Sequence, residues 1–191
     1  DITQLTDGLV FGRDYFSDNS TSYRKHFVFA GSLDRMELDD TDLQFLSLVR
    51  NDARFRLTEV AHKLDIDART VLARQKTLER KGFLQGYTVF LDITKLGIHF
   101  HKLCIHLQQY GEEQQAIIQR LKADPHVIHL IQTLGSWELE VECEYEQPQK
   151  VYDLIRALKN SFPDTVKQID LVTITQELKL EFFPDKSFFR R

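Results

Sequence analysis

Residues 36–97 read MELDDTDLQFLSLVRNDARFRLTEVAHKLDIDARTVLARQKTLERKGFLQGYTVFLDITKLG, and their pattern predicts the fold of the first domain. Its first segment has an acidic start, Asp39, Asp40 and Asp42, and then apolar residues at helical spacing, at Leu43, Phe45, Leu46, Leu48 and Val49. A second apolar stripe predicts another helix, at Leu57, Val60, Ala61 and Leu64. A tight turn at residues 65–67 leads into a third helix. The pattern is typical of a winged helix-turn-helix, which places its last helix in a DNA groove.

The third helix is expected to begin after Asp67 as its N-cap and to end at Gly82, which tolerates positive φ. From residue 68 to residue 81 there are 5 basic residues and 1 acidic residue, Arg69, Arg74, Lys76, Arg80 and Lys81 against Glu79. Because phosphate contacts supply most non-specific DNA affinity, we expect this helix to bind double-stranded DNA. The predicted contacts come from Arg69, Thr70, Arg74 and Lys76. The alternative is an ordinary solvated helix face. The alternating, β-rich residues 83–90 predict a short hairpin, the wing.

Composition narrows the class of protein. The 191 residues, 42% of them hydrophobic, suffice for one or two compact domains. The formal net charge is −4, so any DNA binding must come from a local basic patch. Without a long apolar run or a signal-peptide pattern, we expect a soluble cytoplasmic protein that does not enter a membrane.

Neither a cofactor nor a catalytic constellation is predicted. Cys104 and Cys143 lie in predicted strands without CxxC spacing, so we expect buried free thiols rather than a zinc site or disulfide. A carboxylate–histidine metal site is conceivable, but the histidines lack HExxH spacing: His99, His101, His126 and His129. No metal is therefore expected. Ser136 has no evident histidine partner, and we expect no enzyme activity.

The second half of the chain alternates between strand and helix patterns. The order is β-α-β-β-α-β, over residues 102–108, 112–123, 126–134, 137–145, 148–160 and 166–183. This order predicts a ferredoxin-like domain, with two helices on one face of an antiparallel sheet. The fold class is therefore α+β.

Strand alternation assigns residues to the two faces of this sheet. One set is expected to pack under the helices: Leu103, Ile105, Leu107, Trp137, Leu139, Val141, Cys143 and Tyr145. The other face carries Lys102, Cys104, His106 and Gln108, with glutamates at positions 138, 140, 142, 144 and 146. Unpaired buried charge is costly, so this face is either solvated or in contact with another subunit. In the second case Lys102 and His106 would supply the counter-charges.

Residues 36–184 resemble the Lrp/AsnC (feast/famine) family of transcriptional regulators. The resemblance is carried by Leu38-Asp39-Asp40-Thr41-Asp42, Asn51-Asp52-Ala53-Arg54, Thr70-Val71, Arg74, Leu78-Glu79, Gly82, Gly86-Tyr87 and Asp92 through Leu96-Gly97. The family's Gly-x-x-Asp turn is similar to Gly135-Ser136-Trp137-Glu138.

The resemblance implies a homodimer or higher homo-oligomer that binds DNA through paired recognition helices. It also implies an amino-acid or other small-metabolite effector, bound between dimers. By position, Arg69, Thr70, Arg74 and Lys76 face the DNA. Also by position, Gly135, Ser136 and Glu138 lie near the effector.

Several residues depart from the family pattern. Asp67 replaces the usual serine cap, Leu72 and Ala73 replace polar or basic residues, and Gln75 replaces an apolar residue. Glu138 replaces the effector-turn aspartate and is one methylene longer. One alternative is therefore a metabolite-sensing oligomer that has lost DNA binding. A second alternative, on the same architecture, is an enzyme similar to the sirohaem decarboxylases, although no paired arginines that could clamp a tetrapyrrole are evident.

The expected domains are the helix-turn-helix over residues 36–97, the ferredoxin-like domain over residues 98–184, and a tail over residues 185–191. Residues 1–35 precede this module. Residues 22–31 resemble the chain's own last strand, residues 175–184, so residues 1–35 could be the end of a preceding, similar module. The alternative is a plain N-terminal extension that contains a strand. The sequence starts at Asp1 without a methionine, so we expect a processed chain or a piece of a longer one.

Overall fold

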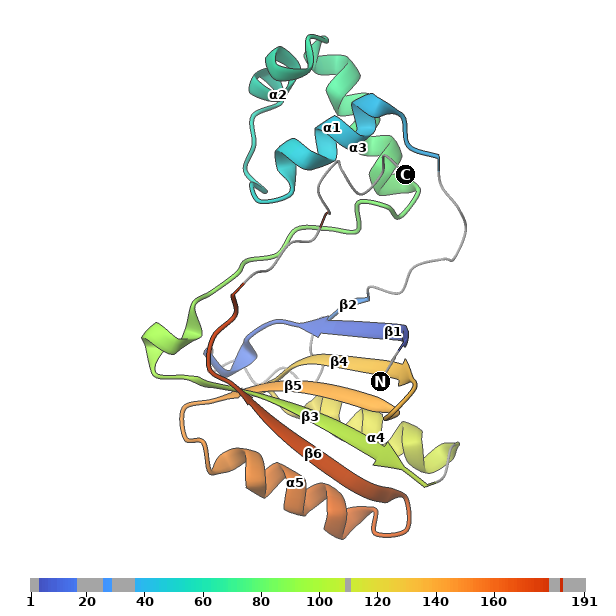
Figure 1. Ribbon diagram of the computed structural model, residues 1–191, viewed down its shortest axis with the longest axis vertical. Coiled ribbons are helices and arrows are strands. Elements are labelled where there is room, and N and C mark those ends of the chain that lie inside the picture. Colours follow the sequence, from blue (N-terminus) through green and yellow to red (C-terminus); the bar gives the residue numbers. More distant parts are fainter. Residues whose placement is uncertain (1–3, 17–25, 29–36, 109–110, 179–182, 184–191) are drawn as a thin grey trace. The chain divides into compact units, whose positions relative to one another are not determined.

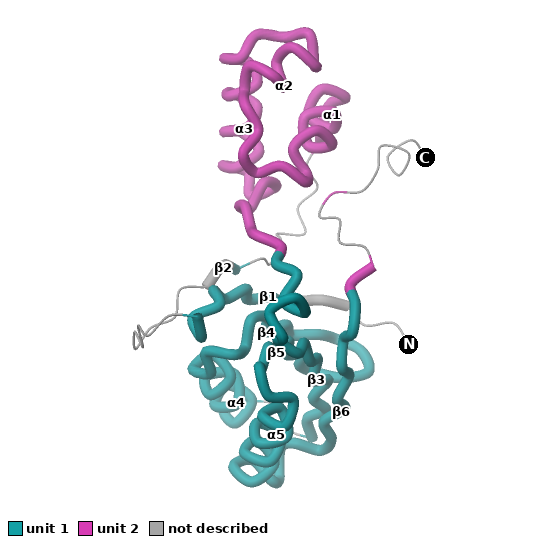
Figure 2. The backbone as a smooth tube through the Cα atoms, turned by 90° about the vertical axis from the view of Figure 1, so that its left-hand side faces the viewer, with its two compact units in different colours: residues 1–30, 91–176 teal, residues 31–90, 177–191 magenta. Residues whose placement is uncertain are grey.

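The computed structural model describes residues 4–16, 26–28, 37–108, 111–178 and 183. The chain forms two compact units, one of residues 1–30 and 91–176 and the other of residues 31–90 and 177–191 (Figure 2). We call them the sheet unit and the helix unit. This division differs from the expected domains, because the N-terminal β segment belongs to the sheet unit. Within the described residues, no helix is long and apolar enough to cross a membrane.

The helix unit contains the three predicted helices, α1 (Asp40–Val49), α2 (Leu57–Leu64) and α3 (Ala68–Arg80). Their apolar faces meet in one core around Phe45 and Val71, which are both fully buried. Phe183, from the end of the chain, joins the same core, with its ring 6.3 Å from that of Phe83. The helix-turn-helix expectation is confirmed.

Side chains fix where α1 and α3 begin. Asp39 and Asp42 form a capping box, in which each carboxylate accepts from the other residue's backbone N–H. The predicted cap at Asp67 is confirmed, because its carboxylate accepts from the N–H groups of Arg69 and Thr70 at 2.8 and 3.0 Å. Asp65 ends α2 with φ 54°, a left-handed conformation that aspartate tolerates better than most residues.

Residues 83–90, where the wing hairpin was expected, form no β-pairing and run on as an extended segment. Alternation favours an extended chain, but a hairpin that turned at Gly86 would have arms of only a few residues, and short isolated hairpins are marginal. Val89 and Phe90 remain exposed. The Tyr87 hydroxyl accepts a hydrogen bond from Gln75 Nε2 at 3.1 Å, which ties this segment to the side of α3.

The sheet unit has the predicted β-α-β-β-α-β order (Figure 1): β3 (His99–Leu107), α4 (Glu112–Ala123), β4 (Val127–Leu134), β5 (Leu139–Tyr145), α5 (Lys150–Ser161) and β6 (Val166–Ile174). All pairings are antiparallel, in the order β2-β1-β4-β5-β3-β6, so the ferredoxin-like fold is confirmed. The added strands β1 (Gln4–Phe11) and β2 (His26–Val28) extend the sheet beyond β4. Short 3-10 helices follow β1 at Asp14–Phe16 (η1) and precede β3 at Ile93–Leu96 (η2).

Helices α4 and α5 cover one face of this sheet, and the core lies between the two helices and the sheet (Figure 1). The predicted inward set is confirmed for Leu103, Ile105, Leu107, Leu139, Val141, Cys143 and Tyr145. Trp137 was predicted wrongly: it precedes β5 in the turn, and its ring lies near His106 of the opposite face, with centroids 6.4 Å apart. The alternation does not extend to residue 137 because the strand begins only at Leu139. Phe11 of β1 is part of the same core, so β1 is integral to the unit.

Candidate nucleic-acid interface

Helix α3 buries the face that contains Val71 and Leu78. Two further rows of side chains run along the rest of its surface. Residues 69, 73, 76 and 80 recur at helical spacing and share one side, which we call the outer stripe: Arg69, Ala73, Lys76 and Arg80. All four are exposed. The three cations make no ion pair with any residue that the structure describes.

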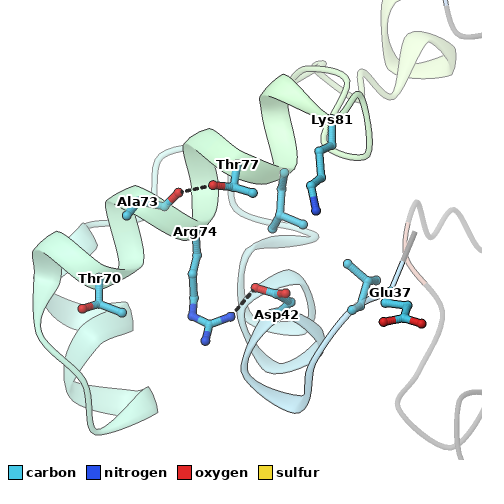
Figure 3. A pocket seen from close by; sticks show the side chains of 9 residues that line it. Glu37, Asp42, Thr70, Ala73, Arg74, Thr77 and Lys81 are labelled. Atoms are coloured by element: carbon cyan, nitrogen blue, oxygen red, sulfur yellow. Dashed lines mark hydrogen bonds and ion pairs between the residues drawn. The ribbon is translucent and has the colours of Figure 1, made fainter. Parts of the chain in front are cut away.

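The second stripe turns toward the start of α1, and we call it the α1-facing stripe: Thr70, Arg74, Thr77 and Lys81. With Ala73 and Leu78 of the same helix, it forms one wall of a shallow hollow of about 380 Å³, whose other wall includes Glu37, Leu38 and Asp42 (Figure 3). The four predicted DNA contacts therefore divide between two sides of α3. Arg69 and Lys76 lie on the outer stripe, while Thr70 and Arg74 lie on the α1-facing stripe.

Thr70 is hydrogen-bonded to Asp67, the N-cap of α3. Its hydroxyl donates to Asp67 Oδ2 at 2.6 Å, and its backbone N–H donates to Asp67 Oδ1. These bonds, the hydroxyl first, lower the pKa of Asp67, so its carboxylate stays ionised at the start of the recognition helix. A DNA phosphate near this helix N-terminus would meet that negative charge.

Arg74 is also partnered. Its Nη1 donates to Asp42 Oδ1 and to Asp39 Oδ2, both at 2.7 Å, and Figure 3 shows the side chain reaching from α3 to Asp42. The hydrogen bonds to Asp42 and then Asp39 raise the pKa of Arg74. The same contact, after the backbone N–H of Asp42, lowers the pKa of Asp39. This pairing could not be predicted from the sequence, because it depends on how α1 and α3 pack against each other.

The predicted effector residues Gly135, Ser136 and Glu138 lie together in the turn between β4 and β5. Glu138 is bound within its own chain: its Oε2 accepts from the Leu107 N–H at 2.7 Å, and its backbone N–H donates to the Ile105 carbonyl at 3.1 Å. The carboxylate thus holds the end of β3. Next to it, the buried indole N–H of Trp137 has no acceptor among the described residues.

The open face of the sheet is a network of paired charges. Lys102 Nζ lies 2.5 Å from Glu140 Oε1 and 3.2 Å from Glu142 Oε1, so Lys102 is paired within its own chain rather than left for another subunit, as the subunit-contact alternative had it. His129 of β4 also bonds to Glu142. Burial alone would raise the pKa of Glu142, but His129 and Lys102 outweigh it and the pKa is lowered. His106 pairs instead with Asp170 of β6, at 2.8 Å.

Glu144, one of the five glutamates, is 1% exposed and is held by the N-terminal segment. Arg13 Nε and Nη2 donate to its two oxygens at 2.8 Å each, and the Tyr15 hydroxyl donates as well. Sequence reasoning missed both partners, because it left residues 1–35 outside the folded module. Among the described residues, no group of three or more His, Cys, Asp or Glu side chains is placed to hold a metal ion.

Comparison with known proteins bears on both units. A family model described as winged helix-turn-helix DNA-binding matches residues 38–85. The chain is 27% identical over 148 residues to an uncharacterized HTH-type transcriptional regulator of Pyrococcus furiosus, covering 76% of this chain and 99% of that protein. It is 42% identical over 60 residues to the HTH-type transcriptional regulator LrpA of Pyrococcus horikoshii, covering 31% and 43%.

Solved structures share this fold over most of the chain. A transcriptional regulator of Neisseria meningitidis, solved in complex with L-Met, is similar with a TM-score of 0.69 and 14% identity. The match covers 80% of this chain and 99% of that chain. With the helix-turn-helix and the ferredoxin-like sheet in place, the chain is similar to transcriptional regulators of the Lrp/AsnC family in both units.

Proposed function

We propose that this chain is a DNA-binding transcriptional regulator that contacts double-stranded DNA through the outer stripe of α3. The observation that carries the proposal is the exposure of Arg69, Lys76 and Arg80 on one side of that helix, without ion-pair partners in the described part of the chain. Unpaired cations on a helix that fits the major groove can each replace condensed counterions at a phosphate. Ala73, between them, offers an apolar contact to a thymine methyl group.

The sheet unit would supply assembly and control. We infer a homodimer or higher homo-oligomer, in which the distance between two recognition helices sets the spacing of the DNA half-sites. Such a regulator would act on DNA in the cytoplasm. A small-metabolite effector near Gly135, Ser136 and Glu138 would shift assembly or DNA affinity, as linkage between two sites requires.

The engaged carboxylate of Glu138 restricts the chemistry of that effector. One oxygen already accepts from the Leu107 N–H, so an amino group would have to share the carboxylate with β3. Thermal-shift screening of the twenty amino acids, L-Met included, against their keto-acid analogues would show whether an amino group is required. Stabilisation by amino acids alone supports an amino-group effector, and equal stabilisation by the keto acids contradicts it.

The DNA proposal is tested by selection from a random duplex library. We expect enrichment of a two-fold symmetric site, with half-sites about 10 base pairs apart or a multiple of that distance. The triple variant Arg69→Ala, Lys76→Ala, Arg80→Ala serves as the matched control and should enrich nothing. A pool bound by the unaltered chain that is as random as the input would contradict sequence-specific binding.

A second candidate is the metabolite-sensing oligomer that has lost DNA binding. The observation that favours it is the ionised Asp67 carboxylate at the start of α3. Absence of DNA binding at low salt, together with an oligomeric state that changes with an effector in analytical ultracentrifugation, would establish this candidate.

A further inference from the structure

We propose that Arg74 positions the recognition helix and does not contact DNA: its guanidinium group holds the middle of α3 to the capped start of α1. The inference rests on the proposed DNA binding and deepens it, by separating the residues of α3 that touch DNA from one that sets the helix in place.

The carboxylate oxygens of Asp39 and Asp42 are divided between the helix cap and Arg74. Asp39 uses Oδ1 for the backbone N–H of Asp42 and Oδ2 for Arg74. Asp42 uses Oδ2 for the backbone N–H of Asp39 and Oδ1 for Arg74. One guanidinium nitrogen therefore bridges both members of the capping box. The start of α1 and the middle of α3 form a single hydrogen-bonded unit, which we call the Arg74 clamp.

The local charge around Arg74 is unfavourable for a DNA phosphate. Two carboxylates face one guanidinium in the clamp, so the site carries a net charge of about −1 when all three groups are ionised. Glu37 lines the same hollow, although Lys81 lines it as well. A phosphate that approached Arg74 would have to displace charge-assisted hydrogen bonds from two acids at once. The outer stripe offers phosphate unpaired cations instead.

Apolar packing alone does not fix how α3 is rotated and shifted against α1. The core between α1 and α3 contains Phe45, Val71 and Leu78, and burial of apolar surface is non-directional. An ion pair with two bonds of 2.7 Å to fixed cap residues adds direction, because small sliding or rotation of α3 breaks it. A recognition helix must hold its side chains within about 0.5 Å of the productive geometry, which such a clamp favours.

The test compares the two sides of the clamp by fluorescence-anisotropy titration of duplex DNA over a salt series. If Arg74 contacted phosphate, Asp42→Asn would release it and tighten binding. The clamp predicts the opposite: Asp42→Asn and Arg74→Ala each weaken binding about tenfold, equivalent to about 1.4 kcal/mol, with an unchanged log–log salt slope. The matched control for loss of an acid is Asp40→Asn, which is exposed and outside the clamp. It should bind no more weakly than the unaltered chain.

A real phosphate contact has its own signature in the same titrations. Lys76→Ala should lower the slope by about 0.9, the value for one phosphate contact on B-DNA. An Arg74→Ala slope lowered by the same amount, or tighter binding by Asp42→Asn, would overturn the positioning role. All affinities are compared at a temperature where circular dichroism shows each variant fully folded. Under these conditions a residue that only supports stability would leave affinity unchanged.

A second measurement needs no DNA and separates failure of this inference from failure of the proposed function. A double-mutant cycle of Arg74→Ala and Asp42→Asn in urea unfolding should show coupling between the two residues. Zero coupling overturns the clamp whatever the DNA result. Coupling without any DNA binding by the unaltered chain would leave the clamp in place and remove the proposed function. If Arg74→Ala does not fold, Arg74→Lys takes its place in the cycle, and we expect the same sign of coupling.

Discussion

The helix unit and the sheet unit handle their charges in different ways. On the open face of the sheet, acidic side chains find cations of the same chain: Lys102 for Glu140 and Glu142, and Arg13 for the buried Glu144. On the outer stripe of α3, Arg69 and Lys76 have no such partner among the described residues. Paired charges of the first kind serve the fold, whereas unpaired cations aligned on one helix are available to a charged partner.

Arg74 shows that position on α3 alone does not decide which kind a residue is. It lies on the recognition helix, yet it is paired in the same manner as the cations of the sheet. The predicted DNA-binding residues therefore fall into two groups, those that have an ion-pair or hydrogen-bond partner in the chain and those that do not, although all of them lie on the same helix. It can be tested by removing paired and unpaired cations in turn.

The largest effect is expected where a pair is most deeply buried. Arg13→Ala leaves the carboxylate of Glu144, 1% exposed, without its two charge-assisted hydrogen bonds. Removing one partner of such a pair leaves an uncompensated buried charge, and we expect a loss of about 3 kcal/mol in the free energy of unfolding of the sheet unit. Urea unfolding followed by the fluorescence of Trp137, the chain's single tryptophan, measures it.

Lys150→Ala is the control for this change, because its partner Asp153 is well exposed and surface pairs contribute little. A stability of the Arg13→Ala protein within experimental error of the Lys150→Ala protein would show that the pairing of Glu144 is not structural.

Removal of the unpaired cations should leave stability nearly unchanged and lower DNA affinity. Arg69→Ala and Lys76→Ala are expected to change stability by less than about 0.5 kcal/mol, as surface substitutions usually do. Each should weaken binding to all duplex DNA and lower the salt slope by about 0.9. Anisotropy titrations at several salt concentrations provide both numbers. Lys63→Ala, an exposed cation of α2, tests whether any loss of positive charge in the helix unit gives the same slope change.

Lowering the pH should decrease the free energy of unfolding of the sheet unit, because it protonates carboxylates that are paired in the folded chain. The folded-state pKa of Glu142 lies below its ordinary value of 4.5, because His129 and Lys102 outweigh the effect of burial. When the pH falls below that ordinary value, the unfolded chain takes up the proton before the folded chain does, so the free energy of unfolding decreases. Above it, this stabilisation is fully present.

The measurement is urea unfolding, followed by Trp137 fluorescence, between pH 6 and pH 3, roughly the carboxylate range. Glu142→Gln should flatten the profile in this interval. An unchanged profile for that variant would show that Glu142 is not the group responsible.

The smallest effect is expected at the cap of α3. Asparagine caps a helix about as well as aspartate does, so Asp67→Asn should keep α3 in place. It removes the negative charge beside the predicted DNA surface, and we expect DNA affinity to rise a few-fold, by about 1 kcal/mol or less, at low salt. The gain should shrink as salt is added. Weaker binding by this variant would show that the carboxylate itself takes part in recognition.

The elements of this fold could be read from the sequence where the signal is local. Apolar periodicity predicted the three helices and the β-α-β-β-α-β order, and an aspartate directly after a tight turn predicted the cap at Asp67. Each of these signals depends on residues that are close together in the sequence. Chemistry that joins distant segments could not be read in this way. Arg13 and Glu144 are 131 positions apart, and Arg74 meets Asp42 only after the helices pack.

Two further differences have the same origin. Residues 83–90 alternate like a strand, but a strand also needs a partner, and alternation says nothing about whether one exists. Trp137 fitted the alternation of β5 by position, although the turn that contains it interrupts the pleat. Thus the candidate DNA residues were found as a set, and only their contacts separated Arg69 and Lys76 from Thr70 and Arg74.

Binding of DNA by the outer stripe of α3 is the proposal on which the others depend. It is tested most directly by the salt dependence of the unaltered chain's binding to random duplex DNA, compared with the triple variant Arg69→Ala, Lys76→Ala, Arg80→Ala. We expect measurable binding for the unaltered chain and, per protomer, a slope that falls by about 2.7 in the variant, 0.9 for each of three contacts. Equal slopes for the two proteins, or no binding by the unaltered chain even at low salt, would contradict it.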